Sequence, residues 1–93
     1  MPAYILLGKY STEGVQGISS ERTREGNQLI ENLGGKVEQT YAVIGEYDLV
    51  MHVQFPDNET AIKGSVELSK LTGISFITMP AVPVVEFDKL ISK

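Results

Sequence analysis

The sequence predicts an α+β fold whose strands and helices follow the order βαββαβ, with a short helix after the last strand. Three observations predict it. Apolar runs of strand length alternate with segments whose apolar residues recur at helical spacing. Glycine, proline and aspartate stand between these segments, where turns and helix caps require them. The residues Gly45-Glu46-Tyr47-Asp48 join two strand-like runs and predict a hairpin at the centre of the chain.

The first half of the pattern is a strand, a loop and a helix. Ala3–Leu7 is a short apolar run typical of a buried strand. The segment Gly8–Gly17 contains three Gly, with one Ser and one Thr between them, so we expect a loop there. A helix should follow with Ser19 or Ser20 as its N-cap. Gly34 should end it, because glycine tolerates the left-handed conformation past the last turn.

The second half supplies three strands and two helices. Lys36–Ile44 and Leu49–Phe55 are the two strands of the central hairpin. The helix Asn58–Leu71 begins after an aspartate that can cap it. A fourth strand is expected at Ile74–Met79, and the proline that follows should end it. A short helix is expected at Pro83–Ile91, with the proline in its first turn.

This order is the ferredoxin-like split βαβ pattern, and we expect residues 1–93 to form one domain of this type. We expect a four-stranded antiparallel sheet with both main helices on one face. Right-handed crossovers should place the first and third strands side by side at the sheet centre, and we expect those two strands to run parallel.

The face that the helices leave open is predicted to be apolar. Along Tyr47–Phe55, which is the third strand with the two residues before it, Tyr47, Leu49, Met51, Val53 and Phe55 should point toward the helices, and Asp48, Val50, His52 and Gln54 away from them. Both faces of the first strand are apolar, and we assign Tyr4 and Leu6 to the open face beside Val50. The faces of the second and fourth strands are left unassigned. Two sheets could bury such patches face to face about a two-fold axis, with Tyr4, Leu6 and Val50 as the interface candidates. Alternatively, the C-terminal helix folds back and covers the patch within one chain.

Composition and charge exclude several classes of function. The chain has a net charge of -4, and its eight Lys and Arg residues are scattered, which disfavours a nucleic-acid partner. The sequence shows no signal peptide with a basic n-region and an apolar h-region, and no apolar run long enough to cross a bilayer. We therefore expect a cytoplasmic protein without a membrane partner. One histidine and no cysteine make a zinc site unfavourable, and no phosphate-binding loop is present. We therefore expect no cofactor and no metal.

Three residues are candidates for binding a small molecule: Tyr4, Asp48 and His52. Asp48 and His52 share a strand face, but four residues of strand separate them by roughly 13 Å, too far for a direct hydrogen bond. They could line one elongated pocket, with Tyr4 on the neighbouring strand. Alternatively, Asp48 and His52 only satisfy interface or solvent hydrogen bonds. No set of catalytic residues is assigned.

The chain resembles the GYD domain family over nearly its whole length. The similar segments are Tyr4-Ile5-Leu6-Leu7, Thr12-Glu13-Gly14, Ser20-Glu21-Arg22, Leu33-Gly34-Gly35-Lys36, Gly45-Glu46-Tyr47-Asp48-Leu49-Val50, Pro56-Asp57-Asn58-Glu59-Thr60-Ala61 and Glu86-Phe87. The resemblance implies a dimeric α/β barrel of ferredoxin-like chains and carries no established activity. Gly45–Met79 also resembles, more weakly, the effector-binding module of leucine-responsive bacterial regulators. This chain shows no helix-turn-helix ahead of that segment.

Three functions are compatible with these sequence features. The first is a small-molecule-binding or sensing module that uses the face between paired sheets. The second is a small cofactor-independent enzyme, oxygenase-like or isomerase-like, that uses the same cavity. The third is a purely structural subunit of a homodimer or larger homo-oligomer. The small number of polar candidates favours binding over catalysis, because an enzyme needs several converging polar groups.

Overall fold

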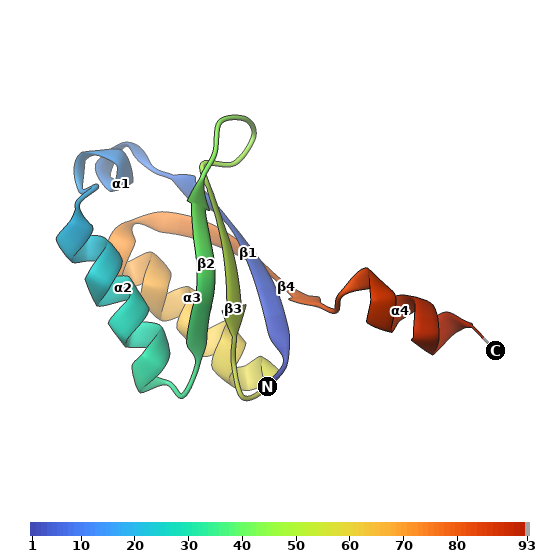
Figure 1. The fold of residues 1–93 in the computed structure, drawn as a ribbon. Coiled ribbons are helices and arrows are strands. Elements are labelled where there is room, and N and C mark those ends of the chain that lie inside the picture. Colours follow the sequence, from blue (N-terminus) through green and yellow to red (C-terminus); the bar gives the residue numbers. More distant parts are fainter. Residues whose placement is uncertain (93) are drawn as a thin grey trace.

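A four-stranded sheet carries two helices on one face, while the C-terminal helix projects away from the body (Figure 1). The structure is a computed structural model that describes residues 1–92. Its elements are β1 (Ala3–Tyr10), α1 (Thr12–Gln16), α2 (Ser20–Asn32), β2 (Lys36–Ala42), β3 (Leu49–Gln54), α3 (Asn58–Thr72), β4 (Ile74–Ala81) and α4 (Val84–Ile91).

The strand order is β2-β3-β1-β4, and each neighbouring pair is antiparallel. This order confirms the predicted ferredoxin-like fold with its antiparallel sheet. The expectation that the first and third strands run parallel is wrong, because β1 pairs with β3 in antiparallel register. The connection through α2 makes β1 and β2 run in the same direction. The hairpin then reverses the chain, and β3 enters between them in the opposite direction.

The loop expected at Gly8–Gly17 is mostly regular structure. β1 continues to Tyr10, and α1 follows at once. The hydroxyl oxygen of Ser11 accepts a hydrogen bond from the N–H of Gly14 at 2.9 Å, which caps α1. The same hydroxyl donates to the carbonyl oxygen of Gly73 at 2.9 Å. Ser11 and Gly14 therefore form a helix cap, and Ser11 also contacts the end of α3. The presence of serine and glycine alone does not distinguish this arrangement from a loop.

Two strand ends also differ from the prediction. β4 continues through Pro80 to Ala81. The proline is tolerated because β4 lies at the edge of the sheet, where a missing N–H costs no ladder hydrogen bond. β2 ends at Ala42, two residues earlier than expected, so a longer connection leads to β3. Gly45 in that connection has a φ of 151°, a backbone conformation that glycine adopts without the strain other residues would meet.

The helix boundaries follow their capping residues as predicted. The side chain of Ser19 accepts a hydrogen bond from the N–H of Arg22 at the start of α2. Asp57 accepts one from the N–H of Thr60 at 2.8 Å at the start of α3. Hydrogen bonds from the Thr60 side chain and then from its backbone lower the pKa of the Asp57 carboxyl below its usual value of 3.8. Gly73, with a φ of 71°, ends α3 in the left-handed conformation.

The core lies between the sheet and the helices α2 and α3. The buried cluster consists of Tyr4, Leu6, Ile30, Met51, Val53, Phe55, Ala61 and Leu68. Met51, Val53 and Phe55 therefore face the helices, as predicted. The assignment of Tyr4 and Leu6 to the open face is wrong, because these side chains are 2% and 0% exposed within this cluster. The register decides the matter: Tyr4 lies opposite Val53, and Leu6 opposite Met51.

Two glycines inside α2 and α3 face the core at different distances from their neighbours. Gly26 of α2 is buried, and a Cβ atom added there would meet the Leu68 side chain at 3.4 Å. Gly64 of α3 lies against the ring of Phe55, where an added Cβ would come within 2.8 Å of two ring carbons. Close packing therefore explains the glycine inside α3, which costs roughly 1 kcal/mol relative to alanine. At Gly26 a distance of 3.4 Å is an ordinary contact and leaves room for a methyl group.

Candidate functional site

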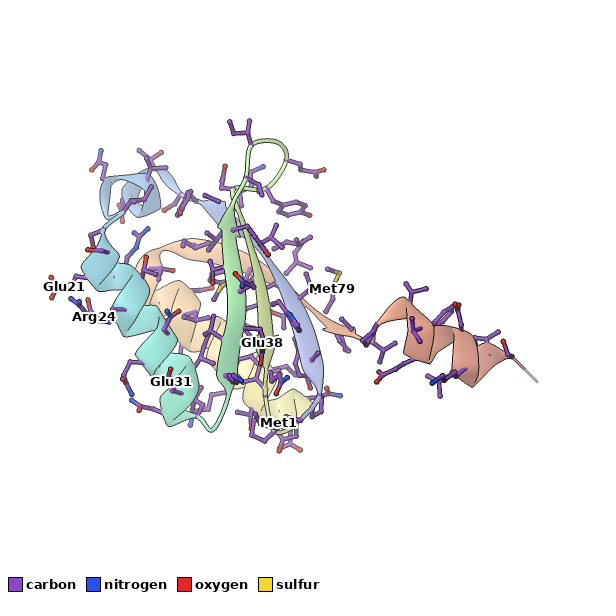
Figure 2. The ribbon with its side chains drawn as sticks, viewed as in Figure 1. Met1, Glu21, Arg24, Glu31, Glu38 and Met79 are labelled. Atoms are coloured by element: carbon purple, nitrogen blue, oxygen red, sulfur yellow. The ribbon has the colours of Figure 1, made fainter. Side chains whose placement is uncertain are left out.

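The sheet face opposite α2 and α3 carries a row of apolar side chains, which we call the open face. Residues directly opposite each other in an antiparallel pair share one face of the sheet. Ile5 lies opposite His52 on one side and Met79 on the other. Leu7 lies opposite Val50 and Ile77, and Tyr41 of β2 continues the row beyond Val50. Figure 2 shows Met79 on the side of the sheet away from the two main helices.

This geometry replaces two of the three predicted interface residues. Val50 lies on the open face as expected. Tyr4 and Leu6 belong to the core and have almost no surface to offer a partner. Ile5 and Leu7 take their place on β1. The sequence could have yielded this result only with the register between β1 and β3, because hydrophobic alternation is absent from a strand that is apolar on both faces.

The helix α4 is a second uncovered apolar surface. It has no buried residue. Val84, Phe87 and Ile91 recur at helical spacing, so they lie along one side of it, with Leu90 adjacent. Phe87 is 50% exposed, and Leu90 is 73% exposed. Neither the open face nor α4 is covered by the rest of the described chain.

Asp48 holds the central hairpin against β1. Its carboxylate accepts a hydrogen bond from the N–H of Tyr10 at 2.9 Å. Its own N–H donates to the carbonyl oxygen of Gly8, and its carbonyl accepts from the N–H of Val43, each at 2.9 Å. All three hydrogen bonds lie where the strands end, next to the turn. The Gly-x-Tyr-Asp turn therefore has a structural use that the sequence did not reveal.

Asp48→Ala is expected to lower the free energy of unfolding by about 1.5 kcal/mol, because the partly buried N–H of Tyr10 loses its charged acceptor. Asp48→Asn keeps an acceptor oxygen and should retain most of the stability. Denaturant titration measures both effects, and hydrogen exchange of the Tyr10 amide locates them. An unchanged exchange rate at Tyr10 in the alanine variant would show that this bond contributes nothing.

His52 and Tyr4 border one hollow at the end of the sheet where β4 leads into α4. The hollow has a volume of about 510 Å³, and Asn58, Pro83 and Glu86 also line it. The Tyr4 hydroxyl donates to the Oδ1 atom of Asn58 at 2.5 Å, so it already has a partner. Asp48 does not line this hollow. The structure therefore brings together two of the three ligand candidates and leaves the third at the hairpin.

A second cavity, of about 70 Å³, lies under the helices beside Arg22. This volume holds a few water molecules and is below the range of metabolite pockets. The guanidinium donates to the carbonyl oxygens of Gly14 at 2.7 Å and Thr72 at 3.2 Å. It also lies 5.7 Å from the centre of the Tyr10 ring. These contacts give Arg22 a structural task, which is to tie α1 to the end of α3.

Other chemistry is not assembled in the part of the chain that the structure describes. Among residues 1–92, no three His, Asp or Glu side chains lie close enough together to hold a metal ion. No helix in the same range is long and apolar enough to span a bilayer.

Comparison with known proteins supplies the family. The glutamine synthetase and cystathionine beta-lyase binding protein of Thermus thermophilus is 32% identical over 89 residues, which cover 92% of this chain and 94% of that protein. The crystal structure of the Mycobacterium tuberculosis leucine response regulatory protein LrpA superposes with a TM-score of 0.59 at 12% identity. That match covers 88% of this chain and 51% of the regulator, and it shows a shared fold. The GYD domain profile matches residues 4–91, and the chain therefore belongs to the GYD domain family.

Proposed function

We propose that this protein is a binding module that pairs with a second copy of itself and docks on another protein. The apolar open face carries this proposal, because uncovered apolar surface on a small domain marks an association site. Ile77 and Met79 on that face are 47% and 39% exposed. A chain of 93 residues buries only a modest core, so covering this surface would add stability that the single chain lacks.

The proposed mode of pairing is sheet against sheet about a two-fold axis. Each copy then offers the same row around Val50, Ile5 and Leu7 to the other copy. Association through this face leaves the outer surfaces of α2 and α3 and the tip of the hairpin free. These surfaces remain available for a different partner.

The proposed partner is a metabolic enzyme of the glutamine synthetase or cystathionine β-lyase type. The name of the Thermus thermophilus relative supports this choice, and that relative aligns with 92% of the present chain. Catalysis by the module itself has less support. The Asp48 carboxylate already accepts a hydrogen bond from the N–H of Tyr10. Within residues 1–92, no carboxylate forms a hydrogen bond with His52 that would orient its ring for catalysis.

Small-molecule binding is the second candidate, and the hollow beside His52 favours it. Its volume of about 510 Å³ falls within the range of metabolite pockets. His52, Gln54 and Glu86 supply polar side chains on a wall that is otherwise mainly apolar. In this case the module would sense a metabolite of the pathway whose enzyme it binds.

Calorimetry with purified enzymes tests the proposal. Glutamine synthetase and cystathionine β-lyase from the organism that encodes this chain are titrated with the intact protein. Binding of either enzyme at micromolar concentration or below is the expected result, and serum albumin serves as the control. If neither enzyme binds and a metabolite shifts the thermal unfolding of the parent but not of His52→Ala, the sensing candidate replaces the docking one.

A further inference from the structure

The helix α4 extends from the body without a covering surface (Figure 1). None of its residues is buried, although five of its eight side chains are large and apolar. Val84, Val85 and Leu90 are each about 70% exposed. Taken at roughly 100 Å² for each such side chain, α4 leaves on the order of 500 Å² of apolar surface in water. That area is at the upper end of the largest patch that monomeric proteins expose.

The connection to α4 opposes a return to its own sheet. Pro83 precedes the helix, and its φ of -58° with a ψ of 144° is an extended conformation. The residue before a proline is also restricted to extended backbone, which stiffens Val82. Pro80 imposes the same restriction on Met79 just upstream. The chain thus leaves β4 nearly straight, and α4 continues outward from the edge of the sheet.

We infer that α4 is an exchanged arm, and that the α4 helix of each copy packs on the β4 margin of the other copy's open face, at Ile77 and Met79, beside the sheet-to-sheet contact around Val50. This inference rests on the proposed pairing and adds the segment that completes it. The two uncovered surfaces of a chain are continuous, since Ile77 and Met79 of the open face lie on the strand that leads directly into α4. A two-fold axis pairs each arm with the other copy's sheet reciprocally.

The areas agree with this assignment. A stable dimer buries roughly 800 Å² on each partner. The arm supplies on the order of 500 Å², and the open face supplies a comparable apolar area through residues such as Ile77, Met79 and Tyr41. Neither surface alone reaches the standard size, whereas the two together do.

Arm exchange also changes the hollow beside His52. Val82, Pro83 and Glu86 at the root of α4 line that hollow in their own chain. When the tip of the arm lies on the partner, the root stays fixed at the rim of the hollow. Any ligand there would then be enclosed only in the paired protein.

Cross-linking between single-cysteine variants tests the arm, because the natural chain contains no cysteine. A tagged full-length Leu90→Cys protein is mixed with untagged Met79→Cys protein and treated with a flexible bis-maleimide. We expect a mixed cross-linked dimer as the main product. The matched control replaces Met79→Cys with Val66→Cys, which lies on the outer surface of α3 and is 50% exposed. This control should give at least tenfold less product.

The possible outcomes distinguish a failure of the arm exchange from a failure of the proposed dimer. If the parent sediments as a dimer and Met79→Cys gives no more product than Val66→Cys, the arm does not lie on the partner and the inference is wrong, while the pairing stands. If a double Leu90→Cys, Met79→Cys chain cross-links only within itself at high dilution, the helix folds back on its own sheet, which also overturns the inference. If the parent sediments as a monomer, both ideas fail together.

Discussion

Val50→Asp is expected to convert the paired protein into monomers. The substitution places one unpaired carboxylate per chain in the middle of the open face, and the two-fold axis brings both into the interface. An uncompensated buried charge costs about 3–5 kcal/mol, so association should weaken by at least roughly two orders of magnitude. Sedimentation velocity of the untagged variant at micromolar concentration measures the change, beside the parent at the same concentration.

Val66→Asp is the matched control for this change. Val66 lies on the outer surface of α3 and is 50% exposed, so the same charge is introduced at a position that the proposed pairing leaves in water. The control should sediment like the parent. The face-to-face arrangement is wrong if Val50→Asp remains dimeric, or if both variants dissociate to the same extent.

Phe55→Ala is expected to lower the free energy of unfolding by about 3–5 kcal/mol, because it leaves a cavity at the centre of the core. The Phe55 ring is fully buried and packs edge-on against Tyr4, with 5.8 Å between ring centres. Gly64→Ala should lower the same quantity by about 1–3 kcal/mol, since its Cβ would lie 2.8 Å from the ring. Denaturant titrations at one fixed protein concentration measure both.

The double variant that combines Phe55→Ala with Gly64→Ala tests whether the two residues pack against each other. Removing the ring removes the clash, and the new methyl group fills part of the space, so the two losses should not add. We expect the double variant to be more stable than the sum predicts by about 1 kcal/mol or more. Gly26→Ala is the control, because its Cβ meets only the flexible Leu68 side chain at 3.4 Å. It should leave stability unchanged or raise it by up to about 1 kcal/mol. Strict additivity at Gly64 and Phe55 would contradict the close packing.

The order of the elements could be predicted from the sequence because hydrophobic period and capping residues are local signals. Ser19, Asp57 and Gly73 mark helix ends through bonds within a few residues of themselves. The helix-facing side of β3 could be predicted for the same reason, since its apolar and mixed residues alternate clearly.

The faces of β1 could not be predicted, because they depend on a long-range register. Tyr4 and Ile5 are equally suited to a buried strand face, and only their pairing with Val53 and His52 distinguishes them. The candidate site could not be predicted for the same reason, because its geometry depends on contacts between distant segments of the chain. Asp48 has a side chain that is typical of binding sites, but its carboxylate accepts a hydrogen bond from the N–H of Tyr10, 38 positions away in the chain. The hollow beside His52 likewise depends on the path of the chain after β4.

The proline in β4 has a consequence for the way copies of this protein can aggregate. β4 forms one edge of the sheet, and an exposed edge is a template on which foreign strands can grow into fibrils. Pro80 removes one N–H from that edge, which interrupts the row of donors that an added strand would need. Lateral growth of the sheet is thereby discouraged at the edge next to the apolar open face, so that self-recognition through a sheet surface can occur without polymerisation along its border.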